Sequence, residues 1–273
     1  MRGEFVDVGG TRLYYYAAGS RGGGDPVVFL HGFPGSSHSW RLMAPLMPEG
    51  RRLVVVDLMG CGRSDGPASA AATGVRAHAA LITGLLDDLR VGRAAVVGHG
   101  FGGAIAQALA VDAPDRVSAL ALMSCPAFGH HLRVAGMARA AAPLARVLGA
   151  SLLASFMHGS AVRGYADPDS GGRSLDVALR AYPAHLGTAA IVGHLAALRD
   201  PDVAAYGARL AAVTAPTLVL WGADDPFIAP SVGECLRDTI RGATLDVIPG
   251  ARHFIPEDAP ERCARAVAAL LAR

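Results

Sequence analysis

The residues Val96-Val97-Gly98-His99-Gly100-Phe101-Gly102-Gly103 carry the strongest fold signal in this chain of 273 residues. Apolar residues typical of a strand run into closely spaced glycines, and a helical pattern follows at once. Two known turns have this layout. Counted from Gly98, the glycines match G-x-G-x-x-G, a dinucleotide-binding turn. They also match G-x-S-x-G, the turn that raises a catalytic nucleophile above a sheet, but Gly100 stands at the nucleophile position.

The dinucleotide-binding interpretation requires an acidic residue about 20 residues further on, at the end of the next strand. Here the next predicted strand ends at Ser124 and Cys125, and neither residue is acidic. The nucleophile turn is therefore the better interpretation of the glycines.

Strand patterns alternate with helical patterns along most of the chain, and several strands are continuous apolar runs of the kind that helices cover on both faces. The predicted strands are Glu4–Val8, Thr11–Ala18, Pro26–His31, Arg52–Asp57, Ala94–Gly98, Val117–Ser124, Thr217–Trp221 and Thr244–Ile248. The predicted helices are Trp40–Leu46, Thr73–Leu89, Phe101–Asp112 and Pro260–Ala272. This alternation predicts an α/β fold with a mostly parallel sheet.

A second motif, Phe29-Leu30-His31-Gly32-Phe33-Pro34, follows a predicted strand and resembles the HGxP loop of many α/β-hydrolases. In that family the residue after His-Gly and the residue after the nucleophile donate backbone N–H groups to an oxyanion hole. The resemblance assigns these donors to Phe33 and Phe101. His31 is expected to hold the loop in place.

Three further loops resemble the same family. Val56–Asp65 matches its D-x-x-G-x-G-x-S-D loop, with Met59 where the family usually has proline, and is expected to be structural. Gly222–Phe227 resembles the loop that carries the triad acid, and Pro249–Phe254 resembles the loop that carries the triad histidine. The resemblance assigns the acid to Asp225, with the adjacent Asp224 as a surface carboxylate, and the general base to His253.

The family resemblance implies an α/β-hydrolase fold: a mostly parallel eight-stranded sheet, helices on both faces and a helical cap insertion. Residues 1–125 and 207–273 are predicted to form the core. Residues 126–206 are predicted to form the cap, because the strand pattern stops there and Ala-rich helical stretches surround a Gly-, Asp- and Pro-rich loop at Gly164–Gly172.

A glycine at position 100 offers no side chain to attack a substrate, which leaves three hypotheses open. In the first, a natural enzyme uses His253 and Asp225 directly as a general base for hydrolysis, elimination or cyclisation. In the second, the chain is an engineered inactive variant, with Gly in place of Ser or Asp, of an esterase, lactonase, epoxide hydrolase or dehalogenase. In the third, the protein is a non-catalytic receptor, although a receptor needs neither an acid–base pair nor an oxyanion loop.

The substrate is expected to be a mainly apolar small molecule, and the oligomeric state is left open. Gly32, His99, Cys125, Tyr165 and Tyr182 are candidates to line its pocket. Core packing is the favoured interpretation of the two tyrosines, and pocket lining or core packing is favoured over a substitute nucleophile for Cys125. The histidines of the cap match no metal-ligand spacing and are expected to be surface or cap residues: His130, His131, His158, His185 and His194. No metal and no cofactor are predicted.

The composition excludes several classes of partner and location. Hydrophobic residues make up 52% of the chain, yet no run reaches the roughly 18 to 20 apolar residues of a membrane span, so no membrane partner is expected. The net charge of +2 comes without a basic stripe, which argues against nucleic acid. The amino terminus lacks the layout of a secretory signal, and the four scattered cysteines suggest reduced thiols, so we predict a cytoplasmic protein.

Overall fold

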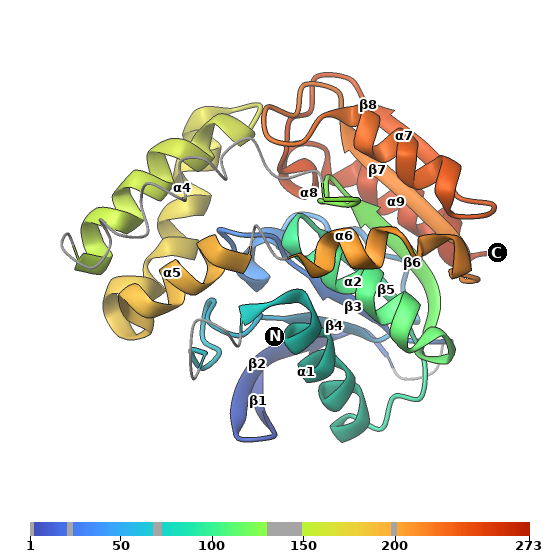
Figure 1. The fold of residues 1–273 in the computed structure, drawn as a ribbon, viewed down its shortest axis with the longest axis horizontal. Helices are drawn as coiled ribbons and strands as arrows, with labels where there is room; N and C mark the ends of the chain where they lie inside the picture. The colour runs from blue at the N-terminus through green and yellow to red at the C-terminus, as the bar shows by residue number, and fades with distance from the viewer. Residues whose placement is uncertain (1–2, 21–23, 68–72, 130–148, 198–200) are drawn as a thin grey trace.

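The computed structural model describes residues 3–20, 24–67, 73–129, 149–197 and 201–273. Its centre is an eight-stranded sheet in the order β1-β2-β4-β3-β5-β6-β7-β8, with helices packed around it (Figure 1). The strands are β1 (Gly3–Val8), β2 (Thr11–Ala18), β3 (Val27–Leu30), β4 (Leu53–Val56), β5 (Ala94–His99), β6 (Val117–Met123), β7 (Thr217–Gly222) and β8 (Thr244–Ile248). Each predicted strand is present, with ends that differ by a residue or so.

Only β1 and β2 run antiparallel to their neighbours, and all pairs from β4 across to β8 are parallel. The predicted fold class is confirmed. Parallel strands place all their carboxyl ends at one edge of the sheet. The loops that follow β3, β5, β7 and β8 therefore meet there, although they are far apart in the sequence.

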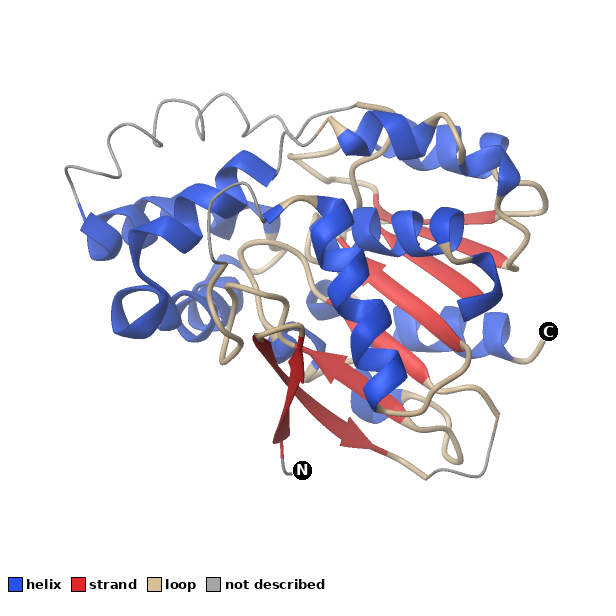
Figure 2. Cartoon of the chain, turned by 60° about the horizontal axis from the view of Figure 1, so that its bottom comes forward, coloured by secondary structure: helices blue, strands red, loops and turns tan. Residues whose placement is uncertain are grey.

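Helices cover both faces of the sheet, as Figure 2 shows. Within β3 the side chains alternate: Val28 and Leu30 pack with α1 (Val75–Asp88) and α2 (Phe101–Asp112), whereas Val27 and Phe29 pack with α9 (Pro260–Leu271). On the first of these faces α7 (Pro230–Thr239) covers the β7–β8 end. Burial on both faces explains why β3 through β7 read as continuous apolar runs.

One predicted helix is wrong. The stretch Trp40–Leu46 instead contributes to two short 3-10 turns, η1 (Ser37–Trp40) and η2 (Ala44–Leu46). The turn η1 begins at Ser37, ahead of the predicted start at Trp40, because the Ser36 hydroxyl accepts a hydrogen bond from the His38 N–H. A continuous α-helix fails because Pro45 has no N–H and its ring collides with the preceding turn of a helix interior.

The regular elements that the structure describes between β6 and β7 are all helical, and short loops connect several of them. They are a helix over residues 149–161, η5 (Val162–Gly164), α4 (Pro168–Leu179), a π-helical turn (Tyr182–Leu186), α5 (Gly187–Ala197), α6 (Asp202–Gly207) and η7 (Leu210–Ala212). We call the segment between β6 and β7 the insertion. In Figure 1, α4 and α5 lie beside the sheet rather than over its faces.

The predicted loop at Gly164–Gly172 is also wrong in its second half, because α4 starts at Pro168. The Asp167 carboxylate accepts from the Asp169 N–H at 3.1 Å, and Pro168 occupies the first helical position. Both are ordinary helix-start signals that a composition-based loop prediction overlooks. Gly171 lies inside α4, where a β-carbon would come within 2.4 Å of the Tyr165 ring.

In the part of the chain that the structure describes, no helix combines the length and the apolar character needed to cross a membrane.

Candidate active site

The turn between β5 and α2 is a tight strand-to-helix elbow centred on Gly100, with φ of 53° and ψ of −123°. The flanking glycines are required by close packing. A β-carbon at Gly98 would lie 2.4 Å from the Gly102 carbonyl oxygen, and one at Gly102 would lie 2.1 Å from the Leu30 carbonyl oxygen. Gly98 and Gly102 thus allow the elbow to press against the loop that follows β3.

Gly100 differs from Gly98 and Gly102 because a β-carbon there would make a tight contact, not a collision, with the surrounding backbone. A β-carbon built on Gly100 would lie 3.2 Å from Gly32 Cα and 3.7 Å from His253 Nε2. Its positive φ is unfavourable for other residues, at a cost of roughly 1–3 kcal/mol. The position therefore faces the imidazole of His253 but presents no atom that can attack a substrate.

His253 and Asp225 form a buried pair on the loops that follow β8 and β7. Nδ1 of His253 donates to Asp225 Oδ2 at 2.8 Å, and both side chains are almost fully excluded from solvent. The other carboxylate oxygen accepts the N–H groups of Phe227 at 2.8 Å and Ile228 at 3.0 Å. This geometry leaves Nε2 of His253 as the acceptor nitrogen, on the side of Gly100.

The charge of Asp225 is stabilised by the same contacts. Burial opposes the charged carboxylate, but the His253 imidazole and the hydrogen bonds that the carboxylate accepts outweigh it and hold the pKa of Asp225 below its ordinary value. An ionised carboxylate at Nδ1 fixes the tautomer of the imidazole and stabilises the imidazolium when Nε2 takes a proton. The adjacent Asp224 is exposed, as predicted.

Phe33 and Phe101, the predicted oxyanion-hole donors, follow β3 and β5 at the same sheet edge. The Phe101 N–H is at the first position of α2 and has no acceptor among the residues described. The next N–H, that of Gly102, donates to the His31 carbonyl at 3.1 Å and so joins the elbow to the loop that carries Phe33. A helix N-terminus also favours negative charge.

His31 is structural, as expected. Its Nε2 accepts the Leu58 N–H at 3.0 Å, so Nδ1 carries the proton and donates to the Gly32 carbonyl at 2.8 Å. Burial lowers the pKa of His31 and keeps the ring neutral. Asp57 holds the neighbouring loops, since its two oxygens accept the N–H groups of Ser37 and Arg63.

Two further histidines pack against Phe33 and Phe101, and no sequence motif indicates either contact. His194 of α5 stacks on the Phe33 ring at 4.8 Å and bonds to the Met59 carbonyl at 3.0 Å. His78 of α1 meets the Phe101 ring edge-on at 5.2 Å. Burial lowers the pKa of His194 to about 3. His194 belongs to the insertion, but it is buried and is therefore not a surface residue.

His99 precedes Gly100 in the elbow and contacts His253. Its Nε2 donates to the His253 backbone carbonyl at 2.9 Å, and the two rings are 5.0 Å apart. Burial lowers the pKa of His99 to about 3, so the ring is neutral at ordinary pH. The structure therefore gives His99 a contact with the loop of the candidate base.

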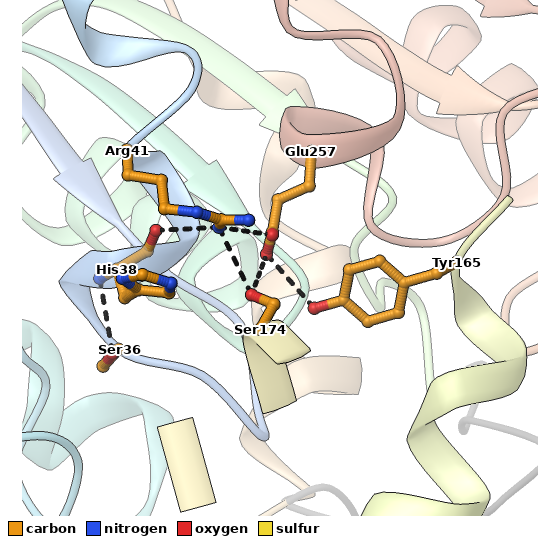
Figure 3. Close-up of polar contacts among 6 residues, drawn as sticks. All are labelled: Ser36, His38, Arg41, Tyr165, Ser174 and Glu257. Carbon is orange, nitrogen blue, oxygen red and sulfur yellow. Dashed lines mark hydrogen bonds and ion pairs between the residues drawn. The ribbon is translucent and has the colours of Figure 1, made fainter. Parts of the chain in front are cut away.

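Tyr165 packs against the other side of the same loop. Its ring stacks on Phe254 at 4.2 Å, and its hydroxyl donates to Glu257 Oε1 at 3.1 Å (Figure 3). Arg41 and Ser174 bind the same carboxylate, which is almost fully buried. The side chain of Tyr182 lies outside the described residues. Tyr165 thus joins the insertion to the core through Glu257.

Cys125 is a buried core residue. Its sulfur accepts from Gln107 Nε2 at 3.4 Å, and burial raises the pKa of the thiol to about 12, so it is not a thiolate nucleophile at neutral pH. Of the insertion histidines, His158 bonds to the Gly172 carbonyl and His185 is exposed, while His130 and His131 lie outside the described residues. No group of three or more His, Cys, Asp or Glu residues is arranged to hold a metal in the ranges that the structure describes.

Comparison with known proteins places this geometry in a family. A profile for the alpha/beta hydrolase fold matches residues 25–260. The 2-hydroxy-6-oxononadienedioate/2-hydroxy-6-oxononatrienedioate hydrolase of Cupriavidus pinatubonensis is 30% identical over 92% of this chain and 89% of that protein. The dihydrolipoyllysine-residue acetyltransferase component of the acetoin cleaving system of Cupriavidus necator is 37% identical over 46% of this chain, and the match spans a third (33%) of that protein's length.

Solved structures agree with the profile. A thermophilic esterase from Thermogutta terrifontis superposes with a TM-score of 0.81 at 26% identity, covering 100% of this chain and 98% of that chain. The likeness extends over the sheet and the insertion alike.

Proposed function

Because the chain belongs to the α/β-hydrolase fold family and keeps the buried His253–Asp225 pair without a nucleophile, we propose that it is a hydrolase that activates water directly. The observation that carries the proposal is the position of His253 Nε2. This nitrogen faces Gly100 and is 3.7 Å from where a β-carbon would be, so the space of a missing side chain lies next to a proton acceptor.

The proposed reaction is addition of water to a carbonyl carbon. His253 Nε2 takes a proton from the water as its oxygen bonds to the carbonyl carbon, and Asp225 stabilises the imidazolium. The carbonyl oxygen becomes an oxyanion that accepts the N–H groups of Phe33 and Phe101. The oxyanion then collapses, the bond to the leaving group breaks, and the imidazolium returns the proton to that group. One water is consumed and an acid and a neutral leaving group are formed.

Hydrolysis is favoured over elimination or cyclisation by the relatives. The Cupriavidus pinatubonensis protein is a 2-hydroxy-6-oxononadienedioate/2-hydroxy-6-oxononatrienedioate hydrolase, and the Thermogutta terrifontis protein is an esterase. We propose an ester, lactone or related carbonyl compound with a mainly apolar body as the substrate. A non-catalytic receptor is less well supported, since binding alone does not require the carboxylate that orients His253.

The test is hydrolysis of a panel of 4-nitrophenyl esters and aromatic lactones by the wild-type protein, His253→Gln and His158→Gln. General base catalysis contributes about 10²- to 10⁴-fold, so turnover should fall by that factor in His253→Gln. His158→Gln, which changes a histidine of the insertion that the proposal does not use, should retain wild-type turnover.

Intact-protein mass spectrometry during turnover distinguishes direct water attack from a covalent mechanism. The wild-type protein should show no acylated species and no burst of product. An acyl adduct, turnover that is indifferent to His253→Gln, or no turnover across the whole panel would each contradict the proposal.

A further inference from the structure

A cleft lies between the core and the insertion, and none of the residues assigned to the candidate active site lines it. Its volume is about 600 Å³, within the range of small-molecule pockets. One wall belongs to the core and includes Tyr14, Tyr16 and Arg63, and the other belongs to the insertion and includes Val177 and Arg180. Neither Gly100, Phe33 nor His253 lines this cleft.

The charge of the cleft is positive. Arg41, Arg63 and Arg180 line it, and Asp57 is the one carboxylate among its described lining residues. Asp57 is almost fully buried, and its oxygens already accept the N–H groups of Ser37 at 2.6 Å and Arg63 at 2.9 Å. This carboxylate therefore fixes the core wall and is not available to neutralise an arginine across the cleft.

The arginines differ in how much of their donor capacity is in use. Arg41 directs Nη1 to the Glu257 carboxylate, the Ser174 hydroxyl and the His38 carbonyl, which fixes its guanidinium in the wall (Figure 3). Its ion pair with Glu257 makes it the weakest candidate to hold an additional anion.

Arg63 and Arg180 have unused donors. The guanidinium of Arg63 lies 4.8 Å from the centre of the Tyr14 ring, and its Nη1 donates to the Tyr14 hydroxyl at 2.9 Å. Among the described residues, the bond to Tyr14 is the one side-chain hydrogen bond of Arg63, and the side chain of Arg180 makes none. Neither arginine forms an ion pair with an acid in the same part of the chain. Arg63 is thus oriented by an aromatic ring, with its remaining N–H groups available.

Much of the rest of the lining is apolar or aromatic. Val177 is 44% exposed and presents an aliphatic surface on the insertion wall. The rings of Tyr14 and Tyr16 lie on the opposite wall with Pro45. Burial raises the pKa of Tyr16 to about 12, so its hydroxyl stays protonated and adds no negative charge.

We propose that this cleft binds a small organic anion that carries a carboxylate on an apolar body. The carboxylate accepts hydrogen bonds from Arg63 of the core and Arg180 of the insertion, and the apolar body packs between the tyrosines and Val177. Arginine suits this role because its planar guanidinium matches the two oxygens of a carboxylate. Because the two arginines belong to opposite walls, the ligand joins the insertion to the core at a second site.

The test is isothermal titration of the full-length protein with octanoate, octanamide and inorganic phosphate. Octanoate should bind in the wild-type protein, whereas octanamide lacks the charge and phosphate lacks the apolar body, so both should bind at least tenfold more weakly. Arg63→Gln and Arg180→Gln should each weaken octanoate binding at least tenfold. Arg237→Gln is the matched control, since this arginine lies on α7 and pairs with Asp238.

Each other result overturns the proposal. No binding of octanoate to the wild-type protein would show that the cleft does not take this ligand. Equal binding by Arg63→Gln, Arg180→Gln and Arg237→Gln would place the octanoate elsewhere, including the candidate active site. Binding of phosphate as tight as that of octanoate would show a simple anion site. Circular dichroism melts establish that the variants are folded, and Arg180→Gln removes no side-chain hydrogen bond or ion pair among the described residues.

Discussion

His253 Nε2 faces Gly100 across a gap of one side chain: a β-carbon on this glycine would be 3.7 Å from the nitrogen. A hydroxyl oxygen is one bond further out than the β-carbon, which brings it within hydrogen-bond reach of the imidazole. The candidate base, its carboxylate and the elbow are thus arranged for a nucleophile that the chain does not have.

Gly100→Ser should create a covalent hydrolase. The serine hydroxyl would be activated by His253, and hydrolysis of an activated 4-nitrophenyl ester should rise at least tenfold with an acyl-enzyme visible by mass spectrometry. Gly100→Ala is the control, because it carries the same positive-φ cost of roughly 1–3 kcal/mol without a hydroxyl. Equal rates in folded Gly100→Ser and Gly100→Ala proteins would mean that residue 100 is not at the reacting centre.

Asp225→Asn should remove most of the turnover while leaving the fold intact. An amide cannot stabilise the imidazolium and favours the wrong tautomer of His253, and the corresponding change in serine proteases costs about 10⁴-fold. Steady-state kcat should fall at least 10²-fold with little change in KM. Asp224→Asn, one residue away and exposed, should behave as wild type; the reverse ranking would assign the acid to Asp224.

His99 should act as a positioning residue for His253. His99→Phe removes the hydrogen bond to the His253 carbonyl, so kcat should drop several-fold while KM changes little. His99→Gln keeps an N–H donor of similar reach and should recover part of the loss. If both variants lose stability equally and neither changes kcat, the contact is structural only.

Stability should fall as the pH is lowered from about 6.5 toward 3. The ordinary pKa of a histidine is 6.5, and the buried rings of His99 and His194 have pKa values of about 3, so between these values the unfolded chain binds protons that the folded chain does not. Each such proton contributes a slope of about 1.4 kcal/mol per pH unit. The stabilisation is therefore complete above pH 6.5 and is lost as the pH falls.

Urea unfolding at a series of pH values measures this slope. His194→Gln should reduce the slope of the unfolding free energy against pH by the contribution of about one proton, which is roughly 1.4 kcal/mol per pH unit. His185→Gln is the matched control, because this histidine of the insertion is exposed and should leave the slope unchanged. A slope that is the same in all three proteins would show that His194 titrates normally in the folded state.

The sequence alone determined the eight-stranded sheet, its parallel core and the identity of the paired residues. Periodicity placed the strands, because burial on both faces leaves a readable apolar run, and the loop motifs put Asp225 and His253 after strands whose carboxyl ends share one edge. Composition alone predicts a loop through Asp167-Pro168, whereas the capping carboxylate and the proline start α4 there.

Tertiary structure alone decided which side chains surround these motifs. The contact of His99 with the His253 carbonyl, the stacking of His194 on Phe33 and the convergence of Arg63 and Arg180 on one cleft each join residues that are more than 100 positions apart in the chain. Periodicity reports only whether a residue faces the core, so it carries no information about which distant element packs there.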